Sequence, residues 1–158
     1  RFSSMRAITT DGTNLYVADN SNNKIRKIVI ASRAVTVLAG PAAGDTTSGD
    51  TDGTANDARF NNPQGIVTDG TNLFVADSLN RKVRKIVIAS GIVSTLAGPA
   101  QGVTGSGDTD GSANTARFGL PGAMTTDGVN LYLCDSSNHK IRKIVIATGE
   151  VSTLAGPA

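Results

Sequence analysis

The chain has 158 residues, with 15 Lys and Arg against 13 Asp and Glu, and this formal net charge of +2 is too small to indicate a polyanionic partner. Its single cysteine, Cys134, excludes an intrachain disulfide, and no apolar run in the sequence is long enough to span a bilayer. Aromatic residues are scarce and Trp is absent, so the core must be built from Ile, Val, Leu and Ala.

A repeat of 58 residues runs through the whole chain. Arg1-Phe2 returns as Arg59-Phe60 and Arg117-Phe118, and Leu-Ala-Gly-Pro occurs at 38–41, 96–99 and 154–157. A fixed period is typical of proteins in which each repeat is one supersecondary unit that buries its apolar faces against its neighbours. We therefore predict three units, which cover residues 1–42, 59–100 and 117–158. Two linkers join them, residues 43–58 and 101–116.

Each unit is predicted to contain four short strands. In the second unit the turn formers Asp69-Gly70-Thr71-Asn72, the polar segment 78–81 and Ala89-Ser90-Gly91 separate segments that are rich in apolar residues. Strands joined by such tight turns form an antiparallel meander. The predicted strands of this unit are 66–68, 73–77, 82–88 and 92–96.

The third predicted strand is apolar at consecutive positions, as Ile28-Val29-Ile30, Ile86-Val87-Ile88 and Ile144-Val145-Ile146. Both faces of its sheet must therefore be covered, whereas a two-layer sandwich would alternate apolar and polar residues. A radial stack of sheets, which is a β-propeller, meets this requirement. A buried helix is the alternative interpretation of a short apolar run, but the flanking turns and β-branched residues favour a strand.

The linkers carry a candidate metal site. Gly49-Asp50-Thr51-Asp52-Gly53 and residues 107–111 place carboxylates at alternate positions in a Gly-rich loop, an arrangement that can surround a calcium ion. The third acidic ligand and the distal Glu of a calcium loop are absent, and Asp-Gly is equally an ordinary turn. The weak calcium candidates are Asp50, Asp52, Asp108 and Asp110; no other cofactor is indicated.

The same rim carries candidate binding residues, because in a meander the linkers and the loops between the second and third strands lie at one end. Basic residues of the third strands would form an arc there, the footprint expected of a nucleic-acid site. Alternatively, these cations pair with Asp19, Asp77 and Asp135, which end the preceding strands. No exposed aromatic series is available to stack bases, so nucleic acid is disfavoured. The candidate binding residues are Asn23, Lys24, Arg26, Arg81, Arg84, His139 and Arg142.

Catalysis is not indicated. His139 is the single histidine, and its variable loop position is typical of a solvated side chain. The predicted inner strands, residues 7–10, 65–68 and 123–126, offer only small, apolar and hydroxyl groups, without a nucleophile–base pair. Arg59-Phe60 and Arg117-Phe118 could form a ligand clamp, but we favour Phe as a plug between units and Arg as the partner of a linker Asp.

The motifs Pro-x-Gly, Asp-Gly-x-Asn-Leu-Tyr/Phe-Val-Ala-Asp and Asn-x-Lys-Ile/Val-Arg-Lys-Ile resemble those of the NHL repeat family of β-propellers. All three units match; Met5 replaces the Pro of the first unit, and Leu133 and Cys134 replace the Val-Ala of the third. The absence of Trp excludes the WD-repeat signature. The resemblance implies an all-β propeller with four-stranded antiparallel blades, of which about six form a ring, so three blades are half of one.

The resemblance implies a non-catalytic scaffold for protein or ligand binding or for self-assembly, in an exported bacterial protein. Two alternatives remain open: blades of a metal-dependent lyase or lactonase whose site lies elsewhere, and an RNA-binding NHL module. Open blade faces are rarely tolerated, so the expected partner is a second copy, three blades plus three, or further blades of a longer chain. A protein or small ligand would bind at the rim.

Overall fold

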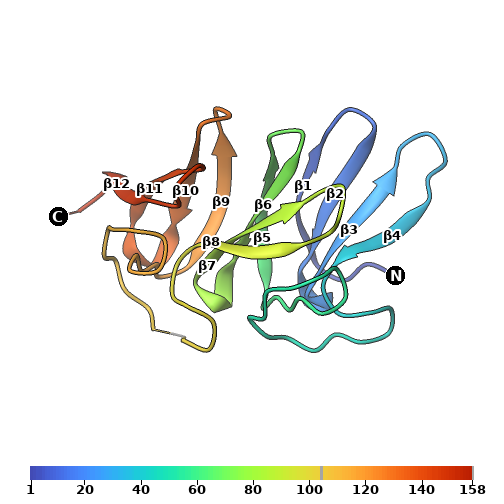
Figure 1. The fold of residues 1–158 in the computed structure, drawn as a ribbon, viewed down its shortest axis with the longest axis horizontal. Coiled ribbons are helices and arrows are strands. Elements are labelled where there is room, and N and C mark those ends of the chain that lie inside the picture. Colours follow the sequence, from blue (N-terminus) through green and yellow to red (C-terminus); the bar gives the residue numbers. More distant parts are fainter. Residues whose placement is uncertain (104, 158) are drawn as a thin grey trace.

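In the computed structural model, which describes residues 1–103 and 105–157, twelve strands form three four-stranded antiparallel sheets, each with its strands in chain order (Figure 1). We refer to these sheets as blades 1, 2 and 3. None of the helical segments in the described residues is long and apolar enough to cross a membrane. Blade 1 contains β1 (Met5–Thr10), β2 (Asn14–Asp19), β3 (Lys24–Val29) and β4 (Val35–Ala39); blade 2 contains β5 (Pro63–Thr68), β6 (Asn72–Asp77), β7 (Lys82–Val87) and β8 (Val93–Ala97); blade 3 contains β9 (Pro121–Thr126), β10 (Asn130–Asp135), β11 (Lys140–Val145) and β12 (Val151–Ala155).

The first strands of the blades converge on one side of the molecule, where β1 lies beside β5 and β5 beside β9 (Figure 1). Their approach is so close that a Cβ at Gly65 would lie 2.2 Å from the carbonyl oxygen of Gly122. A glycine is therefore required where β5 passes β9.

Strand alternation directs the apolar side chains of blade 2 to both of its neighbours. Between blades 1 and 2, Tyr16, Ala18 and Ile25 pack against Val75 and Ile86, all fully buried. Between blades 2 and 3, the opposite face of blade 2 packs in the same way; this cluster contains Phe74, Ala76, Val83, Ala97, Leu131, Leu133, Ile144 and Val151. The consecutive apolar residues of the strands are explained by these two interfaces, and the predicted partial β-propeller is confirmed.

Phe60 and Phe118 are fully buried, one in each of these clusters. The prediction that Phe is a plug between units is therefore confirmed. Arg59 lies 3.9 Å from Asp45 of the linker, as predicted for its partner, whereas the guanidinium of Arg117 donates to the carbonyls of Asn114 and Ala116.

The predicted polar loop between the second and third strands is a single 3-10 turn in each blade: η1 (Asn20–Asn22), η2 (Ser78–Asn80) and η3 (Ser136–Asn138). The residue after each turn is left-handed, with φ of 53° at Asn23, 56° at Arg81 and 55° at His139. Its N–H donates to the carbonyl of the first turn residue. The backbone thus fixes these three positions, while their side chains differ.

The linkers lie on the same rim as these turns, at the lower edge of the blades in Figure 1. The side-chain amide of Asn80 donates to the carbonyl of Gly49 at 2.6 Å, and that of Asn138 to Gly107 at 2.7 Å. Each linker also bridges the outer strand of the blade that follows it, Gly53 with Val93 and Gly111 with Val151. A linker therefore packs on the next blade in the chain.

Candidate functional site

The arginine of each third strand points into the blade rather than into solvent. Arg84 Nη1 lies 2.8 Å from Asp77 Oδ2, and neither side chain is exposed. Arg142 pairs with Asp135 at 3.0 Å and Arg26 with Asp19 at 3.5 Å. The predicted pairing of the strand cations with the preceding aspartates is therefore confirmed for these three arginines.

In blade 2 the linker carboxylates bind the same basic residues. Asp50 Oδ2 accepts hydrogen bonds from Lys82 Nζ at 2.7 Å and from the Gly102 N–H at 2.7 Å. Asp52 accepts from Arg84 Nη2 at 2.6 Å and from the Thr95 N–H at 3.0 Å. We call Lys82, Arg84 and Thr95 of blade 2, together with Gly102 of the following linker, the linker-binding site of blade 2.

Blade 3 repeats this arrangement with the second linker. Lys140 Nζ lies 2.9 Å from Asp108, and Arg142 Nη2 lies 2.8 Å from Asp110. Asp110 also accepts the Thr153 N–H at 2.8 Å. The two aspartates, which are separated by one residue, thus pair with the Lys and Arg of the Lys-x-Arg segment on the third strand of the following blade.

These contacts favour ionised carboxylates. Burial alone would raise the pKa of Asp50, but the hydrogen bonds from Lys82 and Gly102 outweigh it and lower the pKa. The hydrogen bond from Lys140 likewise lowers the pKa of Asp108. A carboxylate that is ionised and charge-paired holds its loop in place.

The four calcium candidates thus contact the Lys and Arg of the third strands. In the two described ranges, no group of three or more His, Cys, Asp or Glu side chains is arranged to hold a metal ion. Calcium binding by Asp50, Asp52, Asp108 and Asp110 remains an untested prediction.

The same arginines stack on the phenylalanine at the start of each repeat. The guanidinium carbon of Arg84 lies 5.3 Å from the Phe60 ring centroid, and Arg142 and Arg26 lie 5.2 Å from the rings of Phe118 and Phe2. A cation over an aromatic ring at this distance is attracted by it. Arg84 and Arg142 therefore each join a linker, a buried aspartate and an interblade plug.

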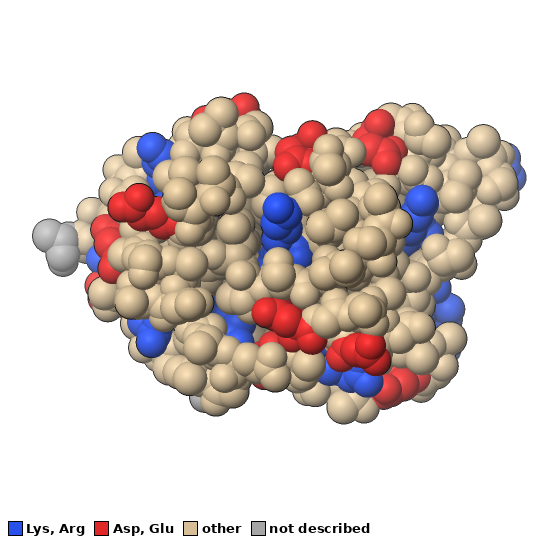
Figure 2. Space-filling view, in the orientation of Figure 1, with Lys and Arg blue, Asp and Glu red and all other residues tan. Residues whose placement is uncertain are grey.

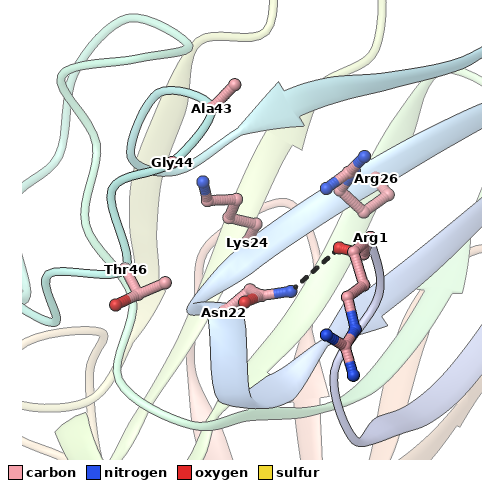
Figure 3. A pocket seen from close by; sticks show the side chains of 7 residues that line it. All are labelled: Arg1, Asn22, Lys24, Arg26, Ala43, Gly44 and Thr46. Atoms are coloured by element: carbon pink, nitrogen blue, oxygen red, sulfur yellow. Dashed lines mark hydrogen bonds between the residues drawn. The ribbon is translucent and has the colours of Figure 1, made fainter.

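In blade 1, by contrast, the equivalent residues line a cavity of about 310 Å³. Lys24 is 3% exposed, and its Nζ donates to the carbonyl of Ala42 at 2.5 Å. No carboxylate of the described residues lies within ion-pair distance of Lys24, and the Arg26 side chain is 14% exposed, against 0% for Arg84. Figure 3 shows the cavity, which is lined by Arg1, Asn22, Lys24, Arg26, Ala43, Gly44 and Thr46.

The predicted binding residues therefore have different environments. Arg84 and Arg142 are fully buried, Lys24 and Arg26 line the cavity, and His139 is exposed on the rim. The Asn23 amide is used within the chain: Nδ2 donates to the Thr46 carbonyl, and Oδ1 accepts the Asn62 N–H. On the face drawn in Figure 2, Lys and Arg are separate spots among Asp and Glu, without a continuous basic arc.

The prediction for the inner strands needs a correction. β1 and β5 begin two residues earlier than the predicted inner segments, so Arg6 and Gln64 belong to these strands. Both line a hollow together with Ala7, Gly65 and Ala123. A cation and an amide, and not only small, apolar and hydroxyl groups, are thus present beside the inner strands.

The pairing of the linkers with the third strands was missed by sequence reasoning. The available signal was the two-residue spacing shared by Asp50 and Asp52 with Lys82 and Arg84, repeated at Asp108 and Asp110. Neither half of this pattern alone identifies its partner 32 residues away.

Comparison with known proteins places these observations in a family, although no family model matches the chain. It is 32% identical over 147 residues to NHL repeat-containing protein 2 of Bos taurus, and the alignment covers 87% of this chain. The chain consists of NHL-type β-propeller repeats. It covers 20% of that relative's length, so the relative's whole-protein role does not transfer to this chain.

Two solved structures from Bacteroides thetaiotaomicron are similar to the NHL-type chain. One is named a putative phosphatase; it is 26% identical with a TM-score of 0.71, and the match covers 96% of this chain and 35% of that one. The other is named an auxiliary nutrient binding protein; it is 20% identical with a TM-score of 0.71, over 94% of this chain and 37% of that one. The second likeness concerns the fold alone.

Proposed function

We propose that this NHL-repeat chain is a non-catalytic scaffold that binds a protein or ligand and assembles through the free faces of blades 1 and 3. The observation that carries the proposal is the exposure, on these two faces, of residues whose counterparts are buried between blades. Apolar patches of this kind mark interaction sites.

The free face of blade 1 repeats the side of blade 2 that packs on blade 1. Ile8 is 58% exposed, whereas its counterpart Ile66 is 4% exposed. Val35 is 41% exposed, whereas Val93 is 2% exposed. A hollow on this face is lined mainly by apolar side chains, among them Phe2, Met5, Ile8, Val17 and Ile28.

The free face of blade 3 repeats the opposite side of blade 2. Its Tyr132, Cys134 and Ile141 are at least partly exposed, whereas the counterparts Phe74, Ala76 and Val83 are fully buried. The two free faces therefore carry the same two residue patterns that pack together inside the chain.

This match supports a second copy as the occupant, with blade 3 of each chain against blade 1 of its partner. Two such head-to-tail contacts would close a ring of three blades plus three. Further blades of a longer polypeptide would satisfy the same faces and are the alternative outcome of the test. Burial of apolar residues would stabilise either arrangement.

Ligand binding and export are part of the proposal. The likeness to a structure named an auxiliary nutrient binding protein gives ligand binding its support, and a propeller rim whose loops vary at little cost to the fold is suited to it. Export from a bacterial cell is supported by the richness of the linkers in Gly, Thr and Ser. The name of the phosphatase neighbour makes an enzyme the competing class.

Light scattering over a concentration series tests the assembly. The expected mass is twice the chain mass of 16.1 kDa, reduced to a monomer by Ile8→Asp or Ile141→Asp. Leu79→Asp is the control, because Leu79 is 47% exposed but lies in η2 on the rim. A monomer at all concentrations would exclude the second copy, and an open-ended ladder of masses would indicate further blades.

A further inference from the structure

The cavity on blade 1 is the counterpart of two sites that each hold a pair of aspartates. In blades 2 and 3 the third-strand Lys and Arg bind Asp50 and Asp52, and Asp108 and Asp110, at 2.6–2.9 Å. Lys24 and Arg26 occupy the same strand positions in β3. The cavity therefore has the chemistry of a site whose ligand is seen twice elsewhere in the molecule.

The backbone of the cavity matches as well. Gly44 lines it and is the counterpart of Gly102, whose N–H binds Asp50. The carbonyl of Ala42 accepts from Lys24, as that of Ala100 does from Lys82. Blade 1 thus presents an ammonium group at the same backbone carbonyl as in the occupied site.

The hydrogen bonds of Asn22 differ in a way that also points to a missing partner. Its counterparts Asn80 and Asn138 donate to the carbonyls of linker glycines that precede the aspartates. Asn22 Nδ2 instead donates to the carbonyl of Arg1 at 3.2 Å, the dashed line in Figure 3. This bond is exposed and long, so a glycine carbonyl could replace it at little cost.

Charge favours an anionic occupant. Burial and the neighbouring Arg26 lower the pKa of Lys24, while Asp45 and Asp19 act in the opposite direction. Asp19 is fully buried and is the ion-pair partner of Arg26, while Asp45 pairs with Arg59, so neither carboxylate forms an ion pair with Lys24. Arg1, Lys24 and Arg26 line the cavity, and carboxylates placed between these cations would relieve their repulsion.

We propose that this cavity binds an acidic peptide segment of the form Gly-Asp-x-Asp-Gly. The first carboxylate binds Lys24 and the Gly44 N–H, and the second binds Arg26. Val37 stands where Thr95 and Thr153 offer hydroxyl groups to the second aspartate, so the first aspartate contributes more to binding. This proposal does not rest on the free blade faces, and the two can fail separately.

The first test uses a fluorescent synthetic peptide with the sequence of residues 47–58, added to the whole chain. We expect saturable binding that weakens as salt is added. Replacing the peptide residues that correspond to Asp50 and Asp52 by Asn, or Lys24 by Gln, is expected to weaken binding about tenfold or more. Lys27→Gln is the matched control, since Lys27 lies on the same strand but points to the opposite face. Equal affinity for the Asp and Asn peptides would overturn the proposal.

The second test supplies the segment in the same polypeptide, by repeating residues 43–58 ahead of Arg1. The extended chain is expected to unfold at a higher temperature than the same extension in which the added copies of Asp50 and Asp52 are replaced by Asn. An equal unfolding temperature for the two extensions would overturn the proposal even if a peptide bound. Light scattering of the same samples reports assembly separately, so a failure of either proposal is recognised independently.

Discussion

Arg84 and Asp77 form an ion pair of 2.8 Å with both side chains fully buried, and the same guanidinium group binds Asp52 of the linker at 2.6 Å. A buried pair offers little net stability over apolar packing, but removal of one partner leaves the other charge without compensation. The Arg84 side chain therefore contacts the blade, the linker and the Phe60 plug at the same time.

We expect Arg84→Met to destabilise the chain by about 3–5 kcal/mol, because Asp77 would remain buried without its cation. Arg26→Met, the matched change in blade 1, also leaves a buried aspartate, Asp19, without its cation, but it is expected to cost less, since Arg26 is partly exposed, its ion pair is longer and it binds no linker carboxylate of the described residues. Urea unfolding followed by circular dichroism measures both. Equal losses of unfolding free energy in the two variants would show that the linker contacts of Arg84 do not contribute to stability.

Gly65→Ala is expected to destabilise the chain by about 1–3 kcal/mol, because the added Cβ would overlap the Gly122 carbonyl and push β5 away from β9. Gly122→Ala is the control: its Cβ would meet nothing closer than 3.6 Å. Thermal unfolding of both variants is the measurement. A Gly122 variant as unstable as the Gly65 variant would refute the steric explanation.

Acid should weaken the turns between the first and second strands. Hydrogen bonds from Asn14 and Tyr16 to Asp11 lower the pKa of that carboxyl, and backbone hydrogen bonds from Asn130 and Val129 lower the pKa of Asp127. The folded pKa values are depressed below the unfolded value of about 3.9. This stabilisation is present above the unfolded pKa and is lost as pH falls through the folded values.

The measurement is the unfolding temperature as a function of pH. Asp11→Asn is expected to lower it at neutral pH and to flatten its fall below pH of about 4. An acid slope that is unchanged in this variant would assign the pH dependence to other carboxylates.

The pKa of Tyr16 predicts how the stability of the chain falls at high pH. Burial and its hydrogen bond to Asp11 raise the pKa of Tyr16 to about 12. Because the folded pKa is above the unfolded value of about 10, the stabilisation is complete below that value and is lost as pH rises through the folded pKa. Titration of phenolate absorbance should show a late transition that disappears in Tyr16→Phe.

The phenylalanine variant should fold, since Phe74 occupies the equivalent position in blade 2. Its expected cost is about 1 kcal/mol, for the lost hydrogen bond. A tyrosine that ionises near its unfolded pKa would show that the bond to Asp11 does not form in solution.

Removal of calcium is expected to leave the unfolding temperature unchanged, because Lys82 and Arg84 already bind the carboxylates of Asp50 and Asp52. Thermal scans with calcium and with a chelator make the comparison. A clear stabilisation by calcium would instead identify the linkers as calcium loops.

The blades were predictable from sequence because turn formers and apolar pairs recur in every unit. The first strand was the least well predicted: β5 begins at Pro63 rather than at Ile66, since a proline is accepted at the first residue of a strand. The plug role of Phe60 was also predictable from its position. The linker-binding sites were not, because the partners of Asp50 are fixed by the way a linker folds over the next blade, and local patterning carries no such information.

The direction in which the linkers pack determines where one module of this protein begins. Asp50 and Asp52 bind residues of the blade that follows them, so a segment from residue 43 to residue 100 contains a blade together with the loop that fastens it. A segment from residue 1 to residue 58 would separate the first linker from its ion-pair partners. Copies appended after blade 3 preserve every such pair when they start at the linker, whereas appended copies that start at Arg1 or Arg59 place a blade at the junction without a linker before it.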